Sequence, residues 1–145
     1  MAEQVDGELN VARLEYAARD SFLAESQSGH AVVTGFAQGD STSPSPMELL
    51  LISLGGCTGA DVYSILRKKR QKVTGYTIEV RGVRREEHPR IYTAIEVVHQ
   101  VRGRKVDPAA VAHAIELSET KYCSVSAMLG TAAKITSHFE ITEEE

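Results

Sequence analysis

The sequence has little cysteine, no excess of basic residues and no long apolar run. Two cysteines in 145 residues are too few for a fold built on permanent disulfides. The net charge of −4 and pI near 5.7 give no support for a nucleic-acid partner, which would need a concentrated basic face. The longest apolar run, MELLLISL, ends at Gly55 and Gly56, well short of the roughly 18 to 20 residues of a membrane span. We therefore expect neither a nucleic-acid partner nor a membrane.

The composition is that of an ordinary globular protein, with 42% hydrophobic and 25% charged residues. No repeat or linker divides the chain, so a single domain over 1–145 is expected, with about 1–10 and 142–145 flexible. The polar N-terminal sequence MAEQVDGELN is unlike a signal peptide. These features predict a cytoplasmic protein.

The first half of the chain predicts strands followed by one long helix. Strands are expected over about 11–22 and 30–36, joined by the turn sequence SQSG. Ser45 and Pro46 form a helix start, and apolar residues recur at helical spacing from 47 to about 69. The closing sequence RKKRQK is read as a solvated helix end, where cations complement the helix dipole, in preference to a nucleic-acid patch.

The second half predicts two strands, two helices and a last strand. The strands cover about 74–86 and 90–102 with the turn EEHP between them. Asp107 and Pro108 start a helix, Ser124 lies near the start of a short one, and KITSHFEIT closes as a strand. Segregated antiparallel strands with one dominant buried helix indicate an α+β fold.

Cys57 lies inside the long helix, next to residues that weaken helices. Each glycine there costs roughly 1 kcal/mol relative to alanine, and three surround the thiol: Gly55, Gly56 and Gly59. Such a cluster implies close approach by a backbone, by a substrate or by a packed helix. A thiolate at Cys57 would need a cation or aimed backbone N–H groups.

Cys123, the second cysteine, precedes the short helix, where unpaired N–H groups and nearby Lys121 favour an anion. Inert packing, a disulfide, a metal pair and a reactive pair are the alternatives for the two cysteines. No CxxC or HxxxH spacing occurs, and the histidines are scattered, so no metal is expected. These histidines are His30, His88, His99, His113 and His138.

Two motifs together carry a family resemblance. SPMELLLISLGGCTGADVYSIL, followed by YCSVSAML, resembles the OsmC/Ohr superfamily of osmotically inducible and organic hydroperoxide resistance proteins, closest to its YhfA-like branch. The resemblance implies an intertwined homodimer whose antiparallel sheets wrap a pair of long central helices. It makes Cys57 the peroxidatic and Cys123 the resolving cysteine of a thiol-dependent peroxidase. The substrate would be a small hydroperoxide, the reductant a dithiol, and no cofactor is implied.

The chain departs from the peroxidase pattern at one position. Peroxidase members have an acid directly after the proline, which holds an arginine that stabilises the thiolate. Here Met47 stands in that slot, and Glu48, which follows about 180° around the helix from Cys57, is the candidate acid of the site. Arg19, with Arg13 as the alternative, is the candidate arginine.

Two functions from different classes follow. The first is a hydroperoxide reductase that uses the Cys57/Cys123 pair in oxidative-stress defence. The second is a binding protein without turnover, which holds a small apolar or thiol-reactive ligand at the dimer interface, and Met47 favours it. Asp61, one turn after Cys57, would take over the arginine-orienting role in the first function or suppress the thiolate if unpaired.

Overall fold

The computed structural model describes residues 7–39 and 41–145. The chain forms two compact units, Met1–Leu49 and Leu50–Glu145, and each has its own sheet. The prediction of flexibility at 1–10 falls largely outside the described residues. The boundary between the units lies in the first turn of α1 (Pro46–Lys68).

Unit 1 contains an antiparallel sheet in the order β1-β2-β3. The hairpin turn at SQSG is confirmed, with Gly29 at φ +85°. The single strand predicted over 11–22 is wrong, because Arg19 and Asp20 adopt left-handed φ angles of 53° and 56° and break it in two. The three strands are β1 (Ala12–Tyr16), β2 (Ser21–Ser26) and β3 (Ala31–Gly35).

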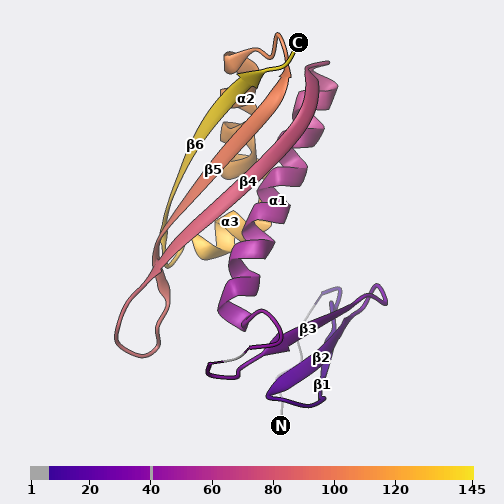
Figure 1. The fold of residues 1–145 in the computed structure, drawn as a ribbon, viewed down its shortest axis with the longest axis vertical. Helices are drawn as coiled ribbons and strands as arrows, with labels where there is room; N and C mark the ends of the chain where they lie inside the picture. Colours follow the sequence, from indigo (N-terminus) through magenta and orange to yellow (C-terminus); the bar gives the residue numbers. More distant parts are fainter. Residues whose placement is uncertain (1–6, 40) are drawn as a thin grey trace. The chain divides into compact units, whose positions relative to one another are not determined.

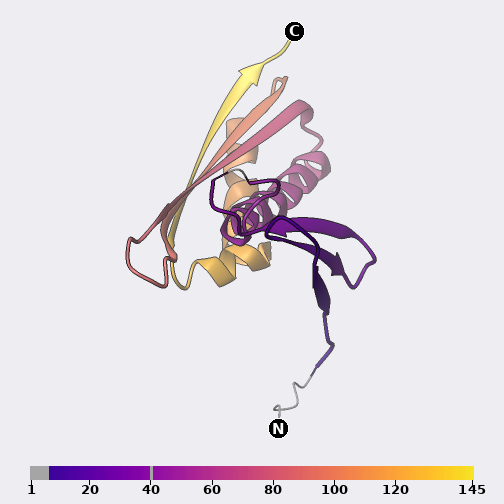
Figure 2. The ribbon, with the colours of Figure 1, turned by 60° about the horizontal axis from the view of Figure 1, so that its bottom comes forward.

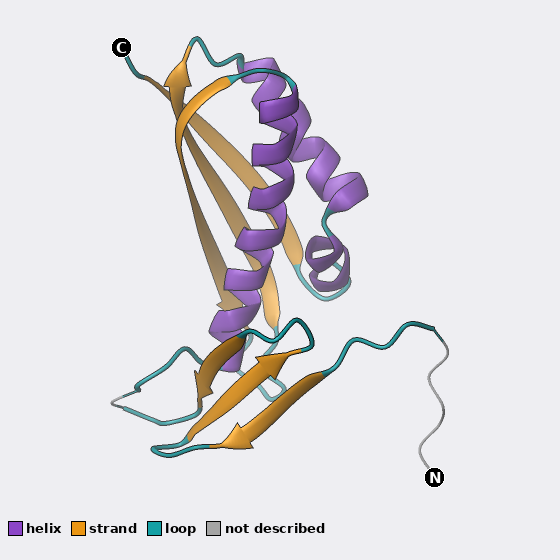
Figure 3. Ribbon diagram, turned by 90° about the vertical axis from the view of Figure 1, so that its right-hand side faces the viewer, coloured by secondary structure: helices purple, strands orange, loops and turns teal. Residues whose placement is uncertain are grey.

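Unit 2 contains the sheet β4-β5-β6 with its helices on one side (Figure 1, Figure 3). The strands are β4 (Lys72–Arg84), β5 (Tyr92–Arg104) and β6 (Lys134–Glu143). Between β5 and β6 come α2 (Pro108–Leu117), the π-helix η1 (Ser118–Tyr122) and α3 (Ser124–Leu129). The α+β class is confirmed.

One strand pairing differs from the expected antiparallel arrangement. β4 and β5 are antiparallel, but β6 runs parallel to β5 (Figure 2). A parallel neighbour needs a long crossover connection, which the three helical segments provide. β6 includes Thr142 and Glu143, and the N–H of Glu144 donates to the carbonyl of Gly103 at 2.8 Å. Residues 142–144, which were predicted to be flexible, therefore form backbone hydrogen bonds with the sheet.

The predicted helix starts are confirmed by their hydrogen bonds. Ser45 Oγ accepts from the N–H of Glu48 at 3.1 Å, and Glu48 Oε1 accepts from the N–H of Ser45 at 3.0 Å. This reciprocal capping box satisfies two otherwise unpaired donors at the start of α1. At α2, Asp107 Oδ1 accepts from the N–H of Ala109 at 3.0 Å.

Helix α1 approaches β4 closely through its glycines. An added Cβ at Gly55 would lie 3.2 Å from Val80 Cγ2, and one at Gly59 would collide with the side chain of Ile78. The close approach inferred from the glycine cluster is therefore made, at these two positions, to side chains of the sheet. The buried cluster beneath α1 and α2 includes Val62, Leu66, Val101, Val106, Ala110, Val111, Ala114 and Ile115.

By length and composition α1 could cross a membrane, which corrects the expectation that no segment approaches one. Its best 18-residue window has a mean hydropathy of 1.6. The same helix buries Leu54, Val62 and Leu66 in unit 2. A core helix passes this test as readily as a membrane span does, so α1 alone is weak evidence for a membrane.

We predict that Leu66→Ala destabilises the fold by about 2–5 kcal/mol, because it leaves a cavity in the core. Leu66 is 0% exposed, whereas Ile52 on the same helix is 61% exposed. Ile52→Ala should change the free energy of unfolding by less than about 0.5 kcal/mol. Urea denaturation followed by circular dichroism measures both, and equal losses would contradict the burial of this face.

Candidate functional site

Three reactive side chains meet in unit 2. The ligand atoms of Cys57, Asp61 and Cys123 all lie within 4.8 Å of one another. Cys57 and Asp61 are four residues apart on α1, which places them one turn apart on the same side of the helix. Cys123 comes from the junction between η1 and α3. The two cysteines predicted to act together are therefore close in space, and both are free thiols.

A chain of hydroxyl groups supports the carboxylate of this cluster. Ser118 Oγ donates to Asp61 Oδ2 at 2.9 Å, and Thr58 Oγ1 lies 3.0 Å from Ser118 Oγ. Since the single hydroxyl proton of Ser118 is used by Asp61, Ser118 accepts from Thr58. Thr58 and Ser118 are both buried, so these two hydrogen-bonded hydroxyl groups hold the orientation of the Asp61 carboxylate from the core side of the helix.

Cys123 is the buried member of the pair. It is 3% exposed, and as the N-cap of α3 its sulfur accepts the N–H of Ser126 at 3.3 Å. Burial is the largest cause of a pKa raised to about 11, and hydrogen bonding to Cys57 adds to it. The expectation that the helix start makes this thiol acidic is wrong, because desolvation outweighs the one N–H bond. Lys121 is exposed, with its ammonium 5.2 Å from the ring centroid of Tyr122.

The other predicted site residues, Glu48, Arg13 and Arg19, belong to unit 1, whereas both thiols belong to unit 2. Glu48 is used in the capping box, and its bonds to Ser45 hold the pKa of its carboxyl below the usual value. Arg13 lies in β1, and Arg19 lies between β1 and β2, so both belong to unit 1 while Cys57 belongs to unit 2. The roles of the two arginines beside the thiol stay predictions.

Sequence reasoning missed the contribution of Ser118 and Thr58. Both lie in helical segments as ordinary hydroxyl residues, 60 positions apart, and no local pattern connects them. The only local signal was the four-residue spacing between Cys57 and Asp61. The π-helical turn that brings Ser118 to Asp61 follows α2 without a break and was not predicted.

Of the histidines, His99 has a structural position in the core. It is fully buried on β5, and its Nδ1 lies 2.5 Å from the hydroxyl of Tyr76. Burial lowers its pKa to about 4, so the imidazole is neutral near pH 7. Burial also raises the pKa of the Tyr76 hydroxyl, and the tautomer of the neutral imidazole determines which of the two atoms donates.

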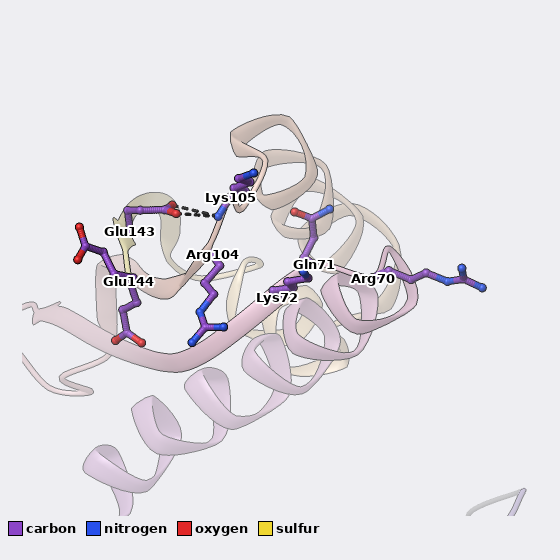
Figure 4. A pocket seen from close by; sticks show the side chains of 8 residues that line it. Arg70, Gln71, Lys72, Arg104, Lys105, Glu143 and Glu144 are labelled. Carbon is purple, nitrogen blue, oxygen red and sulfur yellow. Dashed lines mark hydrogen bonds between the residues drawn. The ribbon is translucent and has the colours of Figure 1, made fainter.

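A cavity of about 540 Å³ lies at the end of the unit 2 sheet where β4 begins and where β5 and β6 end (Figure 4). Its charges are mixed: Arg70, Lys72, Arg104 and Lys105 line it together with acidic residues of the C-terminus. The backbone N–H of Lys105 donates to both oxygens of Glu143 at 3.0 Å. Neither a cysteine nor a histidine lines this cavity.

The raised pKa of Cys123 predicts slow alkylation. In Cys57→Ser, Cys123 should react with iodoacetamide at pH 8 at least about tenfold slower than the same thiol in urea-unfolded protein, because burial, the largest cause of its raised pKa, remains in this variant. The raised pKa also makes the stability depend on pH, because the folded protein holds the Cys123 proton more tightly than the unfolded chain does. The resulting stabilisation of the folded state is fully present below the ordinary pKa of about 9 and is lost as the pH rises toward 11. Equal rates in the folded and unfolded protein would contradict this environment.

The chain matches known proteins over most of its length. A family model described as OsmC-like protein covers residues 39–138. Protein YhfA of Escherichia coli K12 is 45% identical over 130 residues, which are 90% of this chain and 96% of that protein. The crystal structure of a hypothetical protein from Aquifex aeolicus has a TM-score of 0.85 and 39% identity, over 96% of this chain and all of the other.

More distant structures share the fold. The organic hydroperoxide resistance protein OhrB of Bacillus subtilis gives a TM-score of 0.62 at 11% identity, over 92% of this chain and 98% of that one. The family model spans more than half of this chain, and YhfA is similar to it over nine tenths of its length. The chain therefore belongs to the OsmC-like family, within a fold shared with organic hydroperoxide resistance proteins.

Proposed function

We propose that the protein is a thiol-dependent peroxidase that reduces organic hydroperoxides or hydrogen peroxide through Cys57 and Cys123. The observation that carries the proposal is the approach of the two sulfur atoms to within 4.8 Å. Cys57 is half-buried and Cys123 is buried. A peroxide arriving from solvent therefore reaches Cys57 first, which supports its role as the attacking thiol.

The reaction takes two steps on the protein. The Cys57 thiolate attacks the terminal peroxide oxygen, so that an S–O bond forms, the O–O bond breaks, and the alkoxide takes a proton to leave as alcohol. Cys123 then attacks the resulting sulfenic acid; an S–S bond forms, the S–O bond breaks, and hydroxide takes a proton to leave as water. A dithiol reductant restores both thiols by exchange and is itself oxidised to a disulfide.

The first step needs a cation beside Cys57. Asp61 and the second thiol surround it with groups that are negative when ionised. An arginine from unit 1, Arg19 or in its place Arg13, is the proposed source of positive charge. Asp61 would orient that guanidinium, since Glu48 is engaged with Ser45.

We also propose that the protein acts as a homodimer in the cytoplasm. Cross-strand partners in unit 1 put Leu14, Ala24 and Val32 on one face of the sheet, with Tyr16 and Phe22 beside them. Leu14, Tyr16 and Val32 are exposed. An exposed apolar sheet face of this kind is typical of a protein–protein interface, and a second copy of the chain would bury it.

The second candidate function is binding without turnover. An apolar groove of about 490 Å³ supports it, lined by Leu51, Ile52, Gly55, Gly56, Tyr76, Ile78 and Val80. Met47, in the position of the expected acid, also favours a binding protein. A small apolar ligand would fit such a lining. The response of the thiols to peroxide separates the two functions.

Reduced protein treated with one equivalent of cumene hydroperoxide should lose two thiols and about 2 Da of mass, because one disulfide forms. Cys57→Ser should abolish both changes. Cys123→Ser should instead stop at the sulfenic acid of Cys57, which dimedone traps. Unchanged thiols at millimolar peroxide would reject the peroxidase and leave the binding protein.

Arg19→Ala should slow the alkylation of Cys57 by iodoacetamide between pH 6 and 7, because loss of the guanidinium disfavours the thiolate. The measurement uses the Cys123→Ser background, so that only Cys57 reacts. Arg13→Ala is the matched control and should leave the rate unchanged. The reverse result would transfer the role to Arg13, and no change in either variant would remove both arginines from the site.

A further inference from the structure

The cluster of Cys57, Asp61 and Cys123 offers a set of ligand atoms that sequence spacing did not predict. Two sulfurs and a carboxylate converge within 4.8 Å, although the chain contains neither CxxC nor HxxxH. We propose that the reduced protein binds Zn²⁺ through these three side chains. The ligand types fit, because thiolates select Zn²⁺ over the harder divalent cations.

The distances fit a tetrahedral ion after small side-chain movements. Bond lengths of about 2.3 Å to sulfur and 2.0–2.2 Å to oxygen place tetrahedral ligand atoms roughly 3.6–3.8 Å apart. The three atoms already lie within 4.8 Å of one another. Three protein ligands leave the fourth position for water, as in zinc sites that keep an open position.

The Asp61 carboxylate is oriented by a hydrogen bond, as metal-binding carboxylates usually are. Metal-binding carboxylates are themselves hydrogen-bonded, which fixes their orientation. Ser118 donates to Oδ2 of Asp61 at 2.9 Å and is in turn backed by Thr58. A carboxylate has lone pairs on both oxygens, so this bond leaves Asp61 able to bind a cation.

The charge of the cluster favours a divalent ion. Within the described part of unit 2, no lysine or arginine forms an ion pair with Asp61. A bound divalent cation would offset the negative charge of the Asp61 carboxylate and deprotonate the thiols that it binds. Asp61 also lines an open cavity of about 370 Å³, together with Lys68 and Lys69, and neither cysteine is part of its lining.

Zinc binding does not depend on the peroxidase function, but it uses the same sulfurs. A zinc-bound Cys57 would not be free to attack peroxide, and a Cys57–Cys123 disulfide could not supply two thiolates. Zn²⁺ should therefore protect both thiols from oxidation. Binding releases protons from the thiols, so the affinity should fall as the pH is lowered.

The test uses the full chain, reduced and freed of metal with a chelator. Zn²⁺ is titrated by calorimetry, and Co²⁺ serves as the spectroscopic probe because thiolate ligands give a charge-transfer absorption. We expect one ion per chain and a cobalt spectrum with thiolate ligation. Cys57→Ser, Cys123→Ser and Asp61→Asn should each weaken binding by at least about 10–100-fold, the loss seen when even outer residues of a metal site are removed.

Two controls make the result specific. Glu116→Gln, an exposed acid on α2, should bind Zn²⁺ as the parent does. Asp61→Glu keeps a carboxylate and should retain more affinity than Asp61→Asn, which separates ligand loss from misfolding. A cobalt spectrum without thiolate absorption, or Asp61→Asn binding as tightly as the parent, would overturn the zinc site. Thiol loss with peroxide in metal-free protein tests the peroxidase separately.

Discussion

The burial of one stripe of α1 is the constraint on which the rest of unit 2 depends. Leu54, Thr58, Val62 and Leu66 recur every four residues and are all buried. Cys57 and Asp61 each precede a buried residue of this stripe, and both are half-buried at its edge. Such an edge position combines a fixed orientation with access from solvent, which a reactive thiol requires.

The same packing determines the electrostatics of the site. Burying Cys123 stabilises its neutral thiol, while Ser118 holds the Asp61 carboxylate close to both sulfurs. The cluster is thus rich in groups that become anionic and, within the described part of unit 2, is not neutralised by an ion pair to Asp61. Both proposals meet this demand for positive charge, one with an arginine and the other with Zn²⁺.

Local signals predicted the elements that have short-range causes. The capping residues Ser45 and Asp107 form the expected bonds, and the strands β4 and β5 begin two residues from their predicted starts. Prediction failed where the backbone departs from regular geometry, at the left-handed Arg19 and Asp20 and in the π-helical turn. Non-glycine residues rarely adopt left-handed φ angles, and π-helical turns are rare in any sequence, so neither feature has a strong propensity signal.

The sequence by itself determined the α+β class, the long glycine-containing helix and the two cysteine motifs, because periodicity, caps and motifs are local properties. Only the tertiary structure decided that β6 runs parallel to β5 and that Ser118 meets Asp61 beside both thiols. It also reversed the expected acidity of Cys123. These outcomes depend on which segments pack together and how much water they exclude, and the order of residues along one segment does not contain that information.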